Sequence, residues 1–198
     1  MSKIILASAS PRRREILQKL GLSFEVLVAD VDESSTERDP GKLCTLLSRR
    51  KGEAVLEKLQ ARGELSPQTL IIASDTVVFA EGEILGKPKD EADARRMLCL
   101  LSGKRHFVYS GIYLWHSGKG VASCDRTEVI FKELSPNEID NYIATGEPYG
   151  KAGSYAIQGF AKPFVLGIQG DYYTVVGLPV NEMRRLYGAA FPEAEPLF

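Results

Sequence analysis

Short apolar runs and amphipathic stretches succeed one another along most of the chain. Residues 3–7 form an apolar run of strand length, and the β-branched run 70–79 predicts a central strand that polar residues interrupt. A long helix is predicted from Asp39-Pro40, where aspartate can cap the helix and proline fits its first turn. Apolar positions follow at helical spacing as far as Leu59.

Turn and cap residues divide the rest of the sequence. Further helices are expected over 11–21, 90–101, 135–146 and 178–186. Further strands are expected over 23–31, 83–85, 107–115, 121–134, 164–168 and 172–176. Because strands and helices mix without a strict βαβ repeat, we expect a mixed-sheet fold of the α/β class with α+β character. No linker demands a boundary, so one domain over 1–198 is expected.

Composition narrows the class of protein. Hydrophobic residues make up 44% and charged residues 26%, which is typical of a globular chain. The 25 basic and 26 acidic residues give a net charge of −1, whereas a general binder of nucleic acid or of membrane surfaces usually has a basic excess. No apolar run reaches the ~20 residues of a membrane span. The apolar start is too short for a signal peptide, so a cytoplasmic protein is expected.

Few residues could bind a soft metal. The three cysteines, Cys44, Cys99 and Cys124, are far apart and form no CxxC pair, which excludes a zinc ribbon or a disulfide scaffold. With only His106 and His116 available, a histidine-rich metal site is excluded, and we interpret His106 as structural. Any metal would have oxygen ligands, which favours Mg²⁺ or Mn²⁺.

Arg12, Arg13 and Arg14 form a basic triplet in the first turn of a predicted helix. The helix macrodipole disfavours cations there, so the triplet makes sense if an anion docks on the helix end. Arginine also matches phosphate oxygens bidentately. A solvated basic turn, paired with an acid such as Glu15, explains the residues equally well.

Asp75 is placed within an otherwise apolar strand run. A buried carboxylate needs a cation, a metal or hydrogen bonds, and such a group is a candidate general base or metal ligand. The alternative is an acid at a strand end that bonds to a loop. The cost of desolvation favours the functional interpretation.

Two further features carry weaker signals. Lys51 borders the apolar side of the long helix, where a lysine more often extends to water than into a pocket. Asp30, Asp32 and Glu33 cluster at the end of a predicted strand, where two of them could hold Mg²⁺ or all could face water.

Lys87, between Gly86 and Pro88, could reach a ligand or belong to an ordinary turn. Gln158 could read the edge of a base, or cap a loop at the surface. Many cations, a few carboxylates and no obvious nucleophile suit metal-assisted attack of water on a polyphosphate.

An ordered set of short motifs resembles the Maf family of nucleotide pyrophosphatases, over roughly residues 4–186. The motifs are Leu6-Ala7-Ser8-Ala9-Ser10-Pro11-Arg12-Arg13, Asp32-Glu33, Lys51, Ser74-Asp75-Thr76, Gly86-Lys87-Pro88, Ser102-Gly103, Lys151-Ala152-Gly153-Ser154-Tyr155-Ala156-Ile157-Gln158-Gly159, Gly170-Asp171-Tyr172-Tyr173 and Val176-Gly177-Leu178-Pro179.

The resemblance implies an elongated mixed sheet flanked by helices, with two lobes around a central cleft. It implies hydrolysis of nucleoside triphosphates to monophosphate and pyrophosphate, a divalent cation (Mg²⁺ or Mn²⁺), removal of noncanonical or surplus nucleotides, and a homodimer. By motif position, Asp75 would accept a proton, and Glu33 with Asp75 would hold metal. Arg13, Thr76 and Gln158 would determine the choice of substrate. The phosphates would be bound by Ser8, Arg12, Lys51 and Lys87.

Two positions distinguish branches of the family. Arg12 follows Pro11, and Gln158 precedes Gly159, which resembles the branch acting on dTTP and UTP. The branch acting on 7-methyl-GTP tends to have a bulky residue and a glutamate at these places. Two rivals stay open: a nucleotide-binding regulator of cell division with little turnover, and a nucleic-acid binder, which the charge balance disfavours.

Overall fold

The computed structural model describes residues 3–198, which form a seven-stranded mixed sheet. The strand order is β2-β1-β3-β5-β6-β7, and the short β4 pairs with β3 beside this path. Strand β1 is parallel to β2 and β3, and all other pairs are antiparallel. The predicted mixed sheet is therefore confirmed. The strands are β1 Lys3–Leu6, β2 Phe24–Val26, β3 Thr69–Ala80, β4 Glu83–Leu85, β5 Arg105–His116, β6 Lys119–Phe131 and β7 Val165–Gln169.

The described residues also form six α-helices and two short 3₁₀ turns. Capping residues read from the sequence start two of the helices. The Asp39 side chain accepts from Lys42 N (2.8 Å), and Ser135 and Glu138 form a capping box. The helices are α1 Pro11–Lys19, α2 Pro40–Ala61, α3 Glu91–Leu101, α4 Pro136–Ala144, α5 Tyr172–Val176 and α6 Val180–Ala190, with 3₁₀ turns η1 Ala152–Ser154 and η2 Lys162–Phe164.

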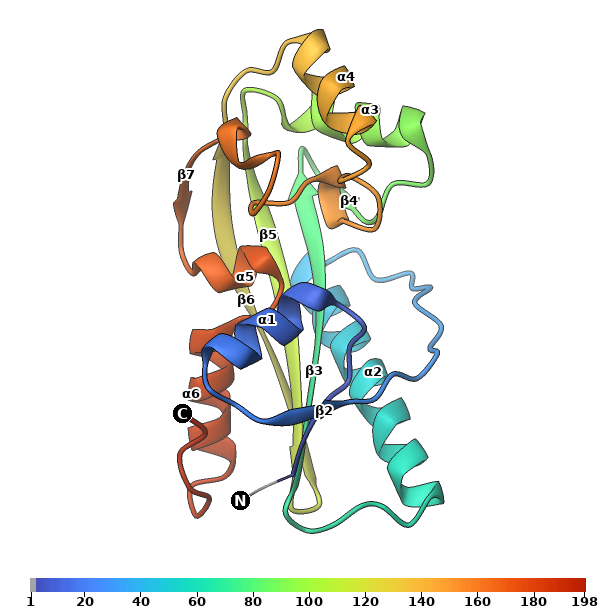
Figure 1. The fold of residues 1–198 in the computed structure, drawn as a ribbon, viewed down its shortest axis with the longest axis vertical. Helices are drawn as coiled ribbons and strands as arrows, with labels where there is room; N and C mark the ends of the chain where they lie inside the picture. The colour runs from blue at the N-terminus through green and yellow to red at the C-terminus, as the bar shows by residue number, and fades with distance from the viewer. Residues whose placement is uncertain (1–2) are drawn as a thin grey trace.

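The molecule is elongated, as Figure 1 shows. The long strands β3, β5 and β6 run through most of its length. Helices α3 and α4 lie with β4 at one end, whereas α2, α6 and β1 lie toward the other. The expected two-lobed arrangement of a mixed sheet with flanking helices is present.

Alternation along β3 sends apolar side chains to both faces of the sheet. Ile71 and Ala73 pack with Val55 and Leu59 of α2, while the other positions join the larger core on the opposite face. Both faces are therefore covered, and β3 is central. Within residues 3–198, no helix is long and apolar enough to cross a membrane.

Three expectations about the elements were wrong. Residues 172–176 form helix α5 rather than a strand: Asp171 caps it by accepting from Tyr173 N (2.9 Å), and Gly177 ends it with φ +118°. The β-branched residues Thr174, Val175 and Val176 are the buried part of this helix. The strand expected over 23–31 is limited to 24–26, because its partner β1 ends at Leu6. Residues 74–76 do not interrupt β3, which pairs with β5 without a break.

Candidate active site

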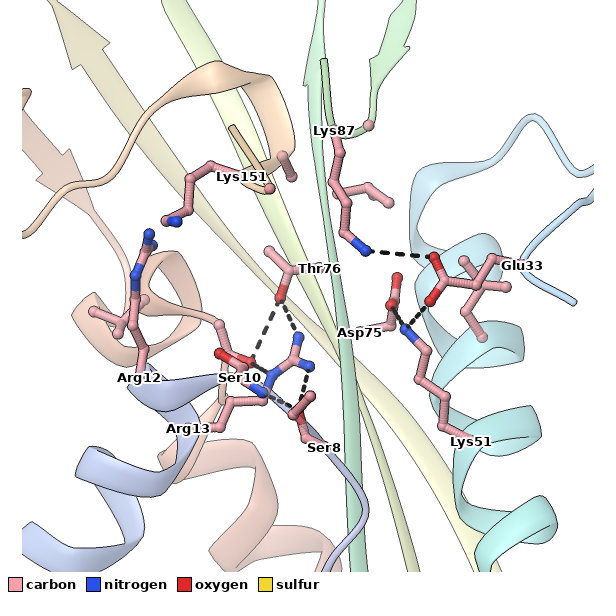
Figure 2. A pocket seen from close by; sticks show the side chains of 18 of the residues that line it. Ser8, Ser10, Arg12, Arg13, Glu33, Lys51, Asp75, Thr76, Lys87 and Lys151 are labelled. Atoms are coloured by element: carbon pink, nitrogen blue, oxygen red, sulfur yellow. Dashed lines mark hydrogen bonds and ion pairs between the residues drawn. The ribbon is translucent and has the colours of Figure 1, made fainter. Parts of the chain in front are cut away.

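A cleft of about 990 Å³ opens where one edge of β3 has no neighbouring strand. Pairing with β1 ends at Ile72, and pairing with β4 begins at Val78. The intervening residues can therefore present side chains to the cleft from both faces of the sheet. Asp75 points to the α2 face and Thr76 to the face of α1 and α5 (Figure 2). The volume is that of a small-molecule site.

An ionic cluster forms the α2 side of the cleft. Lys51 Nζ contacts Asp75 Oδ1 and lies 2.7 Å from Glu33 Oε1, and Lys87 Nζ lies 3.7 Å from Glu33 Oε2 (Figure 2). Burial of Glu33 acts to raise its pKa, but hydrogen bonds and charges from Lys51 and Lys87 outweigh burial and lower the pKa. Asp75 is 8% exposed, and the adjacent ammonium supplies the partner that a buried carboxylate needs.

Close packing of α2 on the sheet lets Lys51 reach Asp75. Gly111 of β5 pairs with Asp75, and a Cβ on this glycine would lie 2.2 Å from the carbonyl oxygen of Cys44 in α2. Glycine is therefore required for the approach of α2. The interpretation that Lys51 extends to water was wrong, since its side chain is 17% exposed and pairs with two carboxylates.

Arg13 connects three segments on the other side of β3. Its guanidinium donates to Gly177 O (2.7 Å), to Ser8 Oγ (3.0 Å) and to Thr76 Oγ1 (3.2 Å) (Figure 2). Thr76 Oγ1 also lies 2.8 Å from Ser110 Oγ. Arg13 and Thr76 are therefore held in fixed positions by the protein.

The start of α1 faces the cleft, and no acidic side chain of its own first turn lies there. Ser10 is the N-cap residue but forms no side-chain cap, and the first turn contains no acidic residue. Arg12 lies half-buried beside it. Burial lowers the pKa of Arg12, and Glu147 is the strongest of the neighbours that act in the opposite direction. Of the basic triplet only Arg14 is exposed, so the solvated-turn interpretation does not describe the whole triplet.

Residues 3–190 match the family model described as Maf-like protein. This chain belongs to the Maf family. It is 47% identical over 186 residues to a protein of Bacillus cereus (strain ZK / E33L) named dTTP/UTP pyrophosphatase, covering 93% of this chain and 94% of the relative. A protein of Agathobacter rectalis with the same name is 47% identical over 201 residues, covering 94% and 98%.

All the residues that the Maf resemblance assigned to the site line this one cleft. They lie on six different segments, so the tertiary structure brings them together. They are Ser8, Arg12, Arg13, Glu33, Lys51, Asp75, Thr76, Lys87 and Gln158.

Two charged residues of the Maf cleft had no assigned role in the sequence analysis. Lys151 lines the cleft, and its ammonium donates to Tyr149 O (3.4 Å). The glycine-flanked motif around Lys151 was one signal for it. Glu147 also lines the cleft, and nothing in its sequence context separates it from a surface glutamate.

The α2 side of the cleft provides some of the ligands that a divalent cation needs. Glu33 and Asp75 present carboxylate oxygens to the same ammonium group, so both lie within reach of one small ion. Mg²⁺ is commonly held by one or two carboxylates together with substrate phosphates. Within residues 3–198, no group of three or more His, Cys, Asp or Glu side chains could hold a metal. The two carboxylates therefore fit an ion whose remaining ligands are substrate phosphates.

Proposed function

We propose that this protein hydrolyses dTTP and UTP to the nucleoside monophosphate and pyrophosphate. The observation that carries the proposal is the position of Asp75: a nearly buried carboxylate, in contact with Lys51, facing the same cleft as the anion-free start of α1. The names of the relatives supply the nucleotides.

In the proposed reaction, Asp75 accepts a proton from the water that attacks the α-phosphorus. The bond from that phosphorus to the α–β bridging oxygen breaks, and pyrophosphate leaves. Lys51 and Lys87 neutralise phosphate oxygens, and Arg12 and Ser8 hold others at the start of α1. Glu33 and Asp75 would hold Mg²⁺ or Mn²⁺, which supplies charge stabilisation to the phosphates when bound.

Substrate choice is assigned to Gln158, Arg13 and Thr76. Gln158 lines the cleft and offers both a donor and an acceptor to a pyrimidine edge. Because three protein acceptors engage Arg13, its proposed effect on choice is to fix Ser8 and Thr76 in position.

The test is a nucleotide panel with Mg²⁺ or Mn²⁺, with products separated by ion-exchange chromatography and the reaction run in ¹⁸O-water. dTMP or UMP carrying one ¹⁸O, together with unlabelled pyrophosphate, supports the proposal. Orthophosphate release, or preference for 7-methyl-GTP, would contradict it. Nucleotide binding without turnover would favour a regulatory role.

An Asp75→Asn variant tests the assigned proton acceptor in the same assay. We expect a loss of kcat of at least about 1,000-fold with nucleotide binding retained. Full activity in this variant would remove Asp75 from the role. The homodimer implied by the resemblance stays a prediction, which sedimentation equilibrium tests.

A further inference from the structure

Glu147, which follows α4, binds the backbone of the segment that carries Gln158. Its two carboxylate oxygens accept from Phe160 N (3.2 Å) and Ala161 N (3.3 Å). It lines the cleft and is only partly exposed. A carboxylate that accepts from two successive backbone amides fixes the local path of the chain.

The segment is shaped to fit this carboxylate. Gly159 has φ +133°, and a Cβ there would lie 2.0 Å from Glu147 Oε1. Any other residue would displace the glutamate or the segment. Gly159 is therefore needed both for its backbone conformation and for the close approach of Glu147.

Tyr142 extends the same network to the other side of Gln158. Its hydroxyl accepts from Ala156 N (3.2 Å). Burial raises the pKa of Tyr142, and the neighbouring Glu147 carboxylate raises it further, so the hydroxyl stays protonated. The pair thus holds backbone amides before and after Gln158.

The Gln158 side chain itself is unattached to the protein. Within residues 3–198, its amide forms no hydrogen bond, and the residue lines the cleft. Its direction is consequently set by its backbone. The charge of Glu147 also acts on Arg12, which is a proposed phosphate ligand.

We propose that Glu147 is the positioning residue that fixes Gln158 for selection of the base. This inference rests on the proposed function, because it names the residue that makes the cleft selective among nucleotides. Glu147 acts through the backbone of 156–161 and takes no part in the proton transfer assigned to Asp75.

The test compares Glu147→Gln with Glu138→Gln. Glutamine keeps the shape of residue 147 but has one acceptor oxygen, so one of the two backbone amides loses its partner. Glu138 is a matched control, because its carboxylate accepts from Ser135 N (2.9 Å) on the same lobe without lining the cleft.

For Glu147→Gln, we expect KM for dTTP to rise about tenfold and the kcat/KM preference for dTTP over ATP to fall at least about fivefold, with kcat within about threefold of the parent. Glu138→Gln should lower thermal stability and leave the preference unchanged. An unchanged preference in Glu147→Gln, or a fall in kcat alone, would overturn the inference.

Two further measurements keep this result separate from the proposed hydrolysis. Calorimetric binding of dTTP and ATP to Asp75→Asn protein, with and without Glu147→Gln, reads selectivity without turnover. If the parent protein hydrolyses no nucleotide while Glu147→Gln still relaxes the binding preference, the result would support Glu147 and contradict hydrolysis, whereas absence of nucleotide binding would overturn both. Should Glu147→Gln fail to fold, Tyr142→Phe removes the acceptor of Ala156 N and should relax the preference in the same direction.

Discussion

The Lys51 ammonium on α2 donates to the Asp75 carboxylate on β3, across 24 residues of sequence. The contact joins a helix to the one stretch of β3 whose outer edge is free of a neighbouring strand. Glu33 completes the cluster from an irregular segment. One cation and two carboxylates are therefore in contact on the α2 side of the cleft.

Replacement of Lys51 by methionine should lower kcat at least about 100-fold, because Asp75 and Glu33 would face each other without their shared cation. The free energy of unfolding should fall by about 1–3 kcal/mol. Steady-state kinetics and urea denaturation measure both effects. Lys42→Met, at an exposed position of the same helix, is the control, and parental kcat in Lys51→Met would contradict the prediction.

Gly111→Ala should separate α2 from the sheet. The new Cβ would lie 2.2 Å from the Cys44 carbonyl oxygen, and this contact is with backbone that cannot rotate away. We expect the free energy of unfolding to fall by about 3 kcal/mol and kcat to fall with it, since Lys51 moves with α2. Gly188→Ala in α6 is the matched control, because nothing lies within 4 Å of its Cβ. It should stabilise by about 0.5–1 kcal/mol.

Stability should decrease on mild acidification through His106. Burial lowers the pKa of this histidine from 6.5 to about 4. Between these values the unfolded chain binds a proton that the folded chain does not, so stability falls as pH falls through this window. The effect is about 2 kcal/mol between pH 7 and pH 5.

Denaturation of a His106→Gln variant at both pH values tests this assignment. Glutamine does not titrate and can still reach the hydroxyl of Tyr155, which lies 2.8 Å from His106 Nε2. The variant should therefore lose less stability than the parent on going from pH 7 to pH 5. Equal losses in the two proteins would assign the acid sensitivity to other groups.

Thiol reactivity should follow the three environments of the cysteines. Cys99 on α3 is exposed, Cys124 on β6 is half-buried, and Cys44 on α2 is buried. Hydrogen bonding to Cys124 and burial raise the pKa of Cys44. Ellman's reagent should label one thiol of the native protein rapidly, and Cys99→Ser should remove that phase. Rapid labelling of Cys44 before unfolding would contradict the packing of α2.

Local chemistry in the sequence predicted most elements. Caps such as Asp39 and Ser135 act within one turn of chain, so their effect is visible without tertiary contacts. The nine site residues that the Maf resemblance assigned all line the cleft, and their roles stay predictions. The strand expected over 172–176 was wrong because β-branched residues indicate burial and do not by themselves determine the conformation. Asp171, which caps α5, and Gly177, which ends it, determine a helix here.

The sequence by itself determined the caps, the apolar periodicity and the set of chemical groups. Only the tertiary structure decided that the outer edge of β3 has no neighbouring strand between β1 and β4, so that Asp75 and Thr76 reach one cleft from opposite faces. It also decided the contacts of Glu147, whose hydrogen-bond partners lie 13 and 14 residues away. The physical reason is that caps and periodicity depend on neighbours in the chain, whereas a free strand edge and a hydrogen bond between distant segments exist only once the chain has packed.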